Sequence, residues 1–229
     1  MSEALRSAHR VRDVFVTNDV AHRHPDLVRQ ADGSSARVTL VSEQVGKSLG
    51  ETVHPQGVVA VVDLPATDLD AALVPGLRLA VLLDGVADPG NAGTVIRTAA
   101  AAGAEAVVFS SNSVDPYGAK CVRASAGAVL HVPIVVGADV EQSVQRLRDL
   151  GVQVLAAALD GDDLFAQGDA LGRPTAWLFG GEAHGLAPEH IALADRRVRI
   201  PMTTRVESLN LAAAASVCLY ASARARGGS

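Results

Sequence analysis

An apolar segment from Leu77 to Leu83, interrupted only by Arg78, constrains the fold of this chain more than any other feature. Strands that are apolar at successive positions are typical of parallel sheets, because helices cover both of their faces. Further strands are expected at residues 106–110, 129–136, 152–159, 175–179 and 197–201, and helices at residues 93–102, 117–126, 140–150, 186–194 and 208–226. This alternation predicts an α/β fold with a parallel sheet.

The first part of the chain alternates in the same way on a smaller scale. Strands are expected at residues 11–17, 37–42 and 58–63, and helices at residues 25–31 and 42–49. Residues 64–76 then combine two prolines, a glycine and acidic residues, which is typical of a linker with at most one helical turn. We predict a domain at residues 1–65, a linker at 66–76 with the boundary near residue 72, and a second domain at 77–229.

Composition limits the core and the cellular compartment. Of the 229 residues, 48% are hydrophobic and only 3% aromatic, so the core must be built from Ala, Val and Leu. Cys121 and Cys218 lack the spacing of metal ligands or of a redox motif, which predicts reduced thiols, a cytoplasmic protein and no metal. The first 13 residues carry three arginines and no apolar run, so we expect no signal peptide. The uncharged stretch at 209–223 is shorter than the about 20 residues that span a bilayer, so no membrane contact is expected.

The net charge of −5 does not favour a nucleic acid as partner, because proteins that bind phosphates usually present a basic surface. It does not exclude one, because local patches matter more than the total. The first 40 residues mix six arginines and three histidines with five acidic residues. From charge alone, an ordinary solvated surface explains this mixture at least as well as a basic face does.

A turn-rich segment, Asp84-Gly-Val-Ala-Asp-Pro-Gly-Asn-Ala-Gly93, follows the apolar strand and leads into a helix. Its glycines lack the G-x-G-x-x-G spacing of a dinucleotide-binding loop, and the Gly-Lys-Ser/Thr of a phosphate-binding loop is missing. Asn91 is placed to cap the helix. Arg97 then lies on the second turn among small apolar residues, where a charged side chain needs a partner. The sequence leaves open whether that partner is an acidic residue or a ligand.

A glycine-rich segment, Leu178-Phe-Gly-Gly-Glu-Ala-His-Gly-Leu186, ends a later strand. Three glycines within six residues require a tight turn or a close approach to a ligand. Glu182 is either solvated or functional, and His184 is expected to be a surface histidine rather than a base.

The last strand ends at Ile200-Pro-Met202, because Pro201 has no backbone N–H to donate. Ser208, in Glu207-Ser-Leu-Asn210, is placed to cap the final helix. Free backbone groups at such ends suit the polar groups of a ligand.

The segment from Ser113 to Gly127 carries Lys120 and Arg123 on one face of a helix. They are either solvent-facing bases or contacts to RNA or to a second subunit.

Together these segments resemble the motifs of the SpoU/TrmH family of RNA ribose methyltransferases, within the SPOUT class. N-x-G-x-x-x-R, F-G-x-E-x-x-G and I-P-M…E-S-L-N are matched in order, residues 113–127 resemble the family's S-x-D-P-x-x-x-K-x-x-R-A-S-x-G, and the match covers roughly residues 77–222. The resemblance implies S-adenosylmethionine as cofactor. The catalytic residues that it implies are Arg97, Asn91, Glu182, Ser208 and Asn210, and the cofactor-binding residues are Leu178, Phe179, Gly180, Gly185, Ile200, Met202 and Leu209.

The activity implied is methyl transfer to a ribose 2′-hydroxyl of RNA. A guanidinium stays protonated and is a poor base, so Arg97 is interpreted as a clamp on an RNA phosphate. Ribosomal RNA is the expected substrate. Transfer RNA is the alternative within the same chemistry, and a non-catalytic RNA-binding relative is the alternative from another class.

The fold implied is a SPOUT parallel sheet with a deep trefoil knot, which ordinary topology rules would not predict, in a homodimer. Residues 1–65 resemble the family's small α/β substrate-binding module, which is like ribosomal protein L30e. Residues 54–60 match the end of that module, and residues 3–9 match its first helix. The module usually begins with a strand before this helix, so we expect the strand to be missing or the natural start to lie upstream of Met1.

Overall fold

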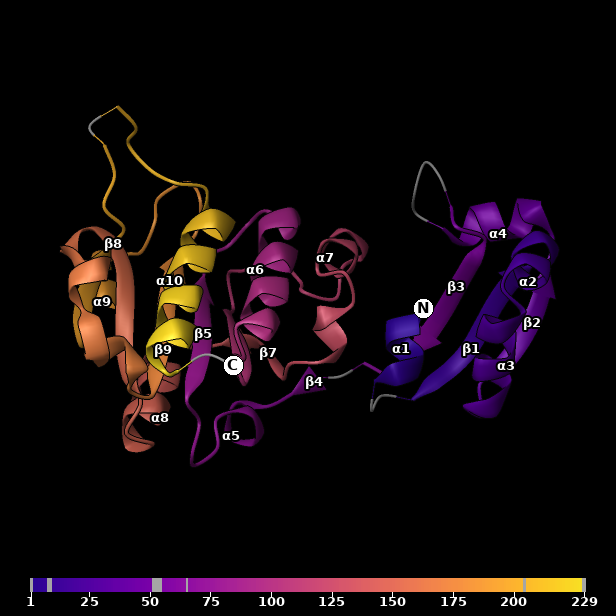
Figure 1. The fold of residues 1–229 in the computed structure, drawn as a ribbon, viewed down its shortest axis with the longest axis horizontal. Helices are drawn as coiled ribbons and strands as arrows, with labels where there is room; N and C mark the ends of the chain where they lie inside the picture. The colour runs from indigo at the N-terminus through magenta and orange to yellow at the C-terminus, as the bar shows by residue number, and fades with distance from the viewer. Residues whose placement is uncertain (1, 8–9, 51–54, 65, 204, 228–229) are drawn as a thin grey trace. The chain divides into compact units, whose positions relative to one another are not determined.

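The computed structural model describes residues 2–7, 10–50, 55–64, 66–203 and 205–227. The chain divides into two units, Met1–Pro65 and Ala66–Ser229, each with its own sheet (Figure 1). His9 and His54, which belong to the expected helix at residues 3–9 and to the expected end of the first domain, lie outside the described residues. Within the described ranges, no helix has the length and apolar character needed to cross a membrane.

The first unit packs short helices on a three-stranded sheet of order β2-β1-β3. The central strand β1 (Val11–Thr17) is parallel to β2 (Arg37–Val41) and antiparallel to β3 (Val58–Val62). The helices are α1 (Ser2–Arg6), α2 (Asn18–Arg23), α3 (Pro25–Gly33) and α4 (Glu43–Leu49). The sequence did not predict α2, which has six residues and one buried side chain. An ion pair between Asp19 and Arg23, one turn apart at 2.5 Å, supports it.

The second unit is built on a seven-stranded sheet of order β10-β8-β9-β5-β6-β7-β4, and every neighbouring pair is parallel. The strands are β4 (Ala66–Thr67), β5 (Leu79–Asp84), β6 (Ala106–Ser110), β7 (Ile134–Ala138), β8 (Gln153–Asp163), β9 (Thr175–Gly180) and β10 (Arg196–Arg199). This confirms the predicted α/β fold with a parallel sheet. The order does not follow the chain, because β9 lies between β5 and β8.

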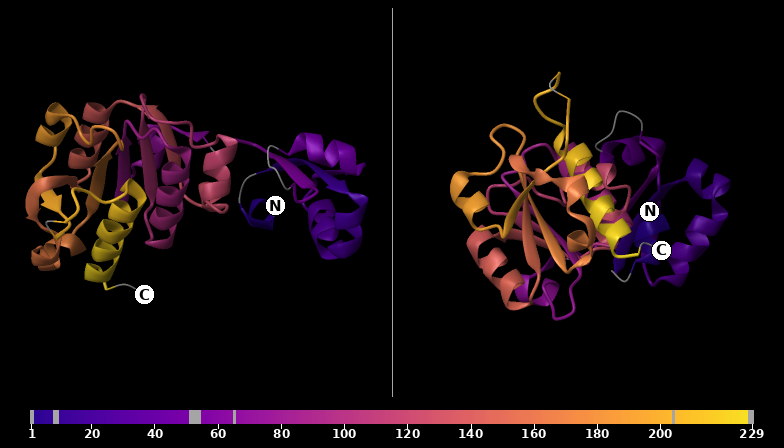
Figure 2. Two further views of the ribbon diagram at one scale, coloured as in Figure 1. Left: turned by 90° about the horizontal axis from the view of Figure 1, so that it is seen from above. Right: turned by 60° about the vertical axis from the view of Figure 1, so that its left-hand side comes forward.

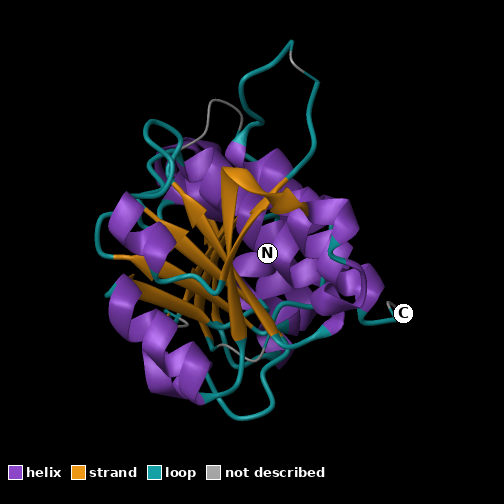
Figure 3. Ribbon diagram, turned by 90° about the vertical axis from the view of Figure 1, so that its left-hand side faces the viewer, coloured by secondary structure: helices purple, strands orange, loops and turns teal. Residues whose placement is uncertain are grey.

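Helices cover both faces of this sheet, which explains why β5 is buried at every residue (Figure 3). Alternate residues of β5 belong to separate core clusters, Leu79 with residues of α6 and α10, and Leu82 with residues of α8. Figure 2 shows α6 and α10 on the same side of the sheet. The helices are α5 (Leu69–Ala72), α6 (Pro89–Ala101), α7 (Ala119–Ala124), α8 (Val140–Asp149), α9 (Pro188–Ala192) and α10 (Leu211–Ala225), with 3-10 turns η1 (Ala128–Leu130), η2 (Leu164–Ala166) and η3 (Gly168–Gly172).

Residues 66–76, expected as a linker, contribute structure to the second unit. β4 pairs with β7 as an edge strand, and α5 is capped by Asp68, whose carboxylate accepts a hydrogen bond from the Ala71 N–H at 2.7 Å. The acidic residue that suggested a linker is therefore a helix cap.

The expected strand at residues 129–136 is wrong in its first half. Gly127, with φ of +92°, starts the turn η1 instead, and the strand begins only after Pro133. Gly adopts positive φ without strain, so the chain turns just before the apolar run, and the first residues of the run form η1 instead of a strand.

A buried hydrogen bond joins β9 to α10. The indole N–H of Trp177 donates to the Ser222 hydroxyl at 3.0 Å, and both residues are completely buried. The bond satisfies the indole in the core, where an unpaired donor would be costly.

Gly93 sets the distance between α6 and α7. A Cβ atom at this position would lie 2.4 Å from the Cys121 carbonyl oxygen and 2.6 Å from the Ala124 Cβ. Gly93, the glycine of the first motif, is therefore explained by the close packing of α6 against α7.

We predict that Gly93→Ala lowers the free energy of unfolding by roughly 1–3 kcal/mol, because α7 must move away from α6. Denaturant unfolding measures the loss. Thr94→Ala is the control, since the neighbouring Thr94 is exposed and its change should stay within about 0.5 kcal/mol. Equal midpoints for the two variants would contradict the packing argument.

Candidate active site

The three motifs meet at the C-terminal edge of the large sheet. β5, β9 and β10 run parallel, and each is followed directly by one motif. Asp84 at the end of β5 is level with Gly180 at the end of β9. The segment after β10 stands out from the same edge in Figure 1. Ligands of open α/β sheets bind beyond the carboxyl ends of strands, so this edge is the candidate site.

Hydrogen bonds between side chains link all three motifs. Asn91 Nδ2 donates to Glu182 Oε1 at 2.8 Å, and Asn210 Nδ2 donates to Asn91 Oδ1 at 2.9 Å. The second carboxylate oxygen of Glu182 accepts from the Ala87 N–H at 3.1 Å. Asn210 Oδ1 accepts from the N–H groups of Ala212 and Ala213 and caps α10. We call Asn91, Glu182 and Asn210 the amide–carboxylate group.

The surroundings of Glu182 favour its ionised form. Partial desolvation alone would raise the pKa of this carboxyl, but hydrogen bonds from Asn91 and from backbone N–H groups outweigh it and lower the pKa below its ordinary value. Glu182 is thus a carboxylate at neutral pH.

The helix α6 begins earlier than predicted. Asp88, not Asn91, is the N-cap, and its carboxylate accepts from the Asn91 N–H at 2.8 Å, with Pro89 at the first helical position. Lys120 of α7 also binds Asp88, at 3.0 Å, and this contact is the largest cause of the lowered pKa of Asp88. Because Asp88 caps the helix, the Asn91 side chain is free to bind Glu182.

Backbone segments approach closely around the second motif. A Cβ atom on Gly180 would lie 2.1 Å from the carbonyl carbon of Gly185, and one on Gly181 would lie 2.0 Å from the Gly85 oxygen. Gly185 has φ of +65°, and Gly181 and Gly185 form an antiparallel bridge. The glycines therefore allow the loop after β9 to fold on itself and on the loop after β5.

Arg97 lies on α6 and is exposed. Among the described residues it has no hydrogen-bond or ion-pair partner. Of the two partners that the sequence left open, an acidic residue of this chain is absent from the described part, and the guanidinium is available to a ligand.

The other residues proposed for the site are placed unequally. The side chains of Leu178 and Phe179 are buried in the core, so only their backbone can meet a cofactor. Ile200 and Met202 are partly buried, and Leu209 is 40% exposed. Ser208 was expected to cap α10, but Asn210 is the cap instead. Ser208 is exposed in the preceding loop. His184 is exposed as well.

Sequence reasoning overlooked two apolar side chains at the same edge. The end of β8 pairs with the end of β10, and Leu159 near this end is 65% exposed. Phe165 in η2, directly after β8, is 68% exposed. The chain has only four phenylalanines, and the position of Phe165 in the loop beyond a predicted strand was the available signal. No cluster of metal-ligating side chains occurs in the described ranges.

We predict that the stability order of the variants Asn91→Asp and Asn91→Ala reverses between pH 8 and pH 5. Asn91→Asp places a second carboxylate against Glu182, which removes the hydrogen bond that lowers the Glu182 pKa and adds repulsion. At pH 8 it should unfold at a lower temperature than Asn91→Ala. Towards pH 5 the two carboxylates can share a proton, so the order should reverse. Thermal unfolding at both pH values measures this, and an unchanged order would show that Asn91 does not face the Glu182 carboxylate.

Known proteins share both units. Residues 78–220 match the SpoU rRNA Methylase family, and residues 1–67 match the family described as RNA 2′-O ribose methyltransferase substrate binding. The chain is 34% identical over 210 residues to the 23S rRNA (guanosine-2′-O-)-methyltransferase RlmB of Bordetella pertussis, which covers 90% of this chain and 85% of RlmB. It is 38% identical over 178 residues to the 23S rRNA (uridine(2479)-2′-O)-methyltransferase of Streptomyces viridochromogenes, covering 75% of this chain and 61% of that protein.

Solved structures agree with this likeness. The SpoU methyltransferase AviRb of Streptomyces viridochromogenes, crystallised with AdoMet, superposes with a TM-score of 0.84 at 31% identity, covering 98% of this chain and 87% of AviRb. The predicted family, the α/β fold and the predicted cofactor are thereby confirmed. The chain belongs to the SpoU rRNA methylase family, whose members are S-adenosylmethionine-dependent RNA 2′-O-methyltransferases.

Proposed function

We propose that this protein transfers a methyl group from S-adenosylmethionine to the ribose 2′-hydroxyl of a nucleotide in ribosomal RNA. The amide–carboxylate group carries the proposal, because it joins side chains of all three motifs at one sheet edge. Two relatives act by name on 23S rRNA, one on guanosine and one on uridine. Guanosine and uridine differ in their bases but share the ribose 2′-hydroxyl, which also distinguishes RNA from DNA.

The residues at the sheet edge fit the cofactor. Backbone groups near Gly180 and Ile200 would hold it, and the exposed side chains of Leu209, Leu159 and Phe165 offer apolar surface for an adenine ring. S-adenosylmethionine supplies a methyl group on a positively charged sulfur, so a neutral thioether leaves. The O2′–CH3 bond forms as the S–CH3 bond breaks, and the hydroxyl proton passes to solvent, directly or through an RNA phosphate.

Arg97 and Glu182 have different roles in this proposal. The unpaired Arg97 guanidinium binds a phosphate next to the target ribose through two parallel hydrogen bonds, which aligns the hydroxyl and stabilises the charge that develops on it. Both oxygens of Glu182 accept hydrogen bonds from other parts of the site. Glu182 is therefore assigned the role of holding the three motifs together.

We predict that Arg97→Ala lowers methyl transfer by about 10²–10³-fold, the loss typical of one donor to a developing oxyanion. Affinity for S-adenosylhomocysteine should stay within a few-fold of wild type. Arg97→Lys should restore little, because an ammonium lacks the planar fork. Tritiated methyl incorporation into ribosomal and transfer RNA fractions measures activity, and calorimetry measures binding.

Arg173→Ala is the matched control for Arg97→Ala. Arg173 is exposed and has no ion pair in the described part of the chain, but it precedes β9 at the opposite edge of the sheet. Equal activity for the two variants would refute the role of Arg97. Methylation of transfer RNA alone would keep the chemistry and change the substrate. No binding of millimolar S-adenosylhomocysteine by the wild type would favour a non-catalytic RNA-binding protein.

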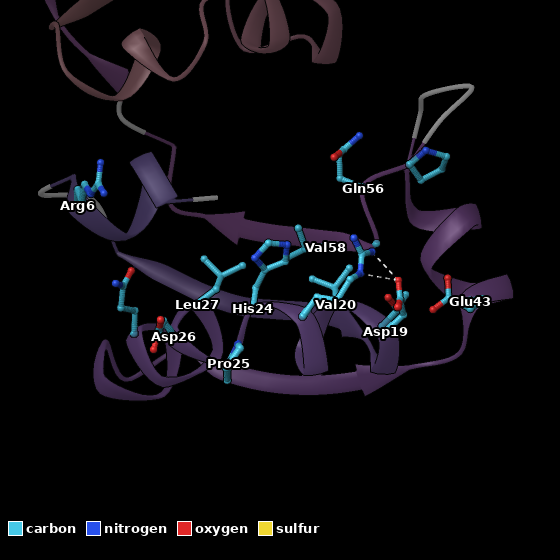
Figure 4. A pocket seen from close by; sticks show the side chains of 15 residues that line it. Arg6, Asp19, Val20, His24, Pro25, Asp26, Leu27, Glu43, Gln56 and Val58 are labelled. Carbon is cyan, nitrogen blue, oxygen red and sulfur yellow. Dashed lines mark hydrogen bonds and ion pairs between the residues drawn. The ribbon is translucent and has the colours of Figure 1, made fainter.

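We also propose that the first unit binds RNA through base contacts in an open pocket of about 710 Å³ (Figure 4). Its lining includes the His24 ring, on which a base can stack, and the Gln30 and Gln56 amides, which both donate and accept hydrogen bonds. Net positive charge does not explain binding here, since residues 1–65 contain seven basic and eight acidic residues. Five of the arginines bond to acidic neighbours: Arg6 to Glu3, Arg12 to Asp63, Arg23 to Asp19, Arg29 to Asp26 and Arg37 to Asp13.

We predict that His24→Ala weakens RNA binding by about 1–3 kcal/mol, the value of one stacked base, without changing cofactor affinity. His22→Ala is the control, because His22 is on the neighbouring helix, bonds the Asn18 carbonyl oxygen at 2.7 Å and does not line the pocket. Fluorescence anisotropy with a labelled ribosomal RNA fragment measures affinity. Equal losses for the two histidine variants would exclude the pocket as a base site.

Three further proposals rest on the family resemblance, namely a homodimer, a cytoplasmic location and a trefoil knot in the second unit.

A further inference from the structure

A buried carboxylate lies at the C-terminal end of β5, on the opposite face of the sheet from α6. Asp84 is 5% exposed, and its Oδ2 lies 2.6 Å from Nδ1 of His190 on α9. A carboxylate oxygen only accepts hydrogen bonds, so Nδ1 of His190 is the donor. None of the three motifs contains His190, and the proposed reaction does not use it.

His190 is the partner on which the buried Asp84 depends. The other oxygen, Oδ1, is buried and has no hydrogen bond in the described structure. The space beside Asp84 is lined mainly by apolar side chains, among them Leu82, Val108 and Leu178, and leaves no room for a water molecule. A charge in such surroundings is stable only when it is paired, so loss of the contact with His190 would be costly. The contact therefore fixes where His190 lies.

The helix α9 is short and only partly covered, and its apolar contact is made by Ile191, which packs against the core on this face of the sheet. It has five residues, none of them buried, and no side chain caps its N-terminus. Helices this short are unstable in isolation. Within the described ranges, the His190–Asp84 bond is the one side-chain hydrogen bond that joins α9 to another element. The position of α9 is therefore set by this hydrogen bond together with the packing of Ile191.

The loop at residues 181–187 lies between β9 and α9 and is fixed at both ends. Glu182 binds Asn91 and Ala87 at its start. At its far end, Leu186 is nearly buried and α9 follows at Pro188. Asp84 at the end of β5 is level with Gly180 at the end of β9, where the loop begins. The His190–Asp84 bond therefore holds the residues after the loop close to the residue before it.

We propose that Asp84 and His190 form a clasp that holds the loop at residues 181–187 in the arrangement that binds the cofactor. His190 is thus a positioning residue, which acts through the loop and sets cofactor affinity rather than the rate of methyl transfer. The proposal rests on the proposed function only in assigning the cofactor to this loop.

The test compares His190→Ala, the double variant Asp84→Ala/His190→Ala and Ser222→Ala in the full-length protein. His190→Ala leaves an unpaired buried carboxylate, so it should unfold at a clearly lower temperature. The double variant removes that charge and should recover part of the loss while still lacking the clasp. Ser222→Ala leaves the Trp177 indole N–H without its acceptor. This variant is the control, because it destabilises the protein at the C-terminal end of α10, away from the loop.

Two readouts separate the clasp from general stability. Hydrogen exchange of the free protein should become faster in peptides that cover residues 181–187 in both His190 variants, and stay unchanged there in Ser222→Ala. If the released loop adopts the binding arrangement about a tenth of the time, the Kd for S-adenosylhomocysteine rises about tenfold in both His190 variants. The rate of methyl transfer at saturating cofactor should stay near that of wild type.

The proposal is overturned if loop exchange is unchanged in the His190 variants, or if the double variant regains wild-type affinity together with stability. It is also overturned if Ser222→Ala raises the Kd as much as His190→Ala does. A wild-type protein that fails to bind S-adenosylhomocysteine, yet shows faster loop exchange on loss of His190, would refute the proposed function and leave the clasp standing.

Discussion

The carboxylate of Glu182 is the group on which the arrangement of the site depends. It accepts hydrogen bonds from the first turn of α6 through Asn91 and from the loop after β5 through Ala87, and Asn91 in turn binds the cap of α10. The positive ends of two helices, of 13 and 15 residues, are thereby gathered around one negative charge. Hydrogen bonds from Asn91 and from backbone N–H groups lower the pKa of Glu182, so the residue serves the site as a fixed anion.

That arrangement is possible only because several positions have no side chain. Gly180 and Gly181 let the loop after β9 pack on its own backbone and on that of Gly85, which brings Glu182 within reach of Asn91. Gly93 lets α7 lie directly against α6, so that Lys120 reaches Asp88 at the start of α6. The glycines shared with the family's motifs are thus explained by contacts within this chain, before any ligand is considered.

Sequence patterns predicted the parts of the fold that depend on local chemistry. The apolar run of β5 predicted a strand covered on both faces, and β6 was predicted at its observed bounds, because every residue of these strands is buried. Patterns failed where a tertiary contact decides. Asn91 and Ser208 both have side chains suited to capping, but Asp88 and Asn210 cap the helices, and the alternatives differ by only a few residues.

The site was predictable as a set of residue types but not as a geometry. The motifs identified Asn91, Glu182 and Asn210, yet nothing in their spacing shows that they bond to one another, since that depends on β9 lying beside β5. Likewise, no pattern marked His190, because its partner Asp84 is 106 residues away along the chain. The strand order, which brings these residues together, is not a property of any local segment.

The distribution of ion pairs explains how an acidic protein can be suited to RNA. In the first unit, arginines are matched by neighbouring carboxylates, so little free positive charge is available there. In the described part of the second unit, several arginines have no such partner, among them Arg97 in the first motif, Arg199 at the end of β10 and Arg205 in the segment after β10. Attraction between exposed cations and phosphates is screened over about 8 Å at physiological salt, so the placement of these cations matters more than the net charge of −5. In the proposed function, the unpaired arginines near the motifs attract the RNA backbone to the site, and the first unit adds base contacts that depend little on salt.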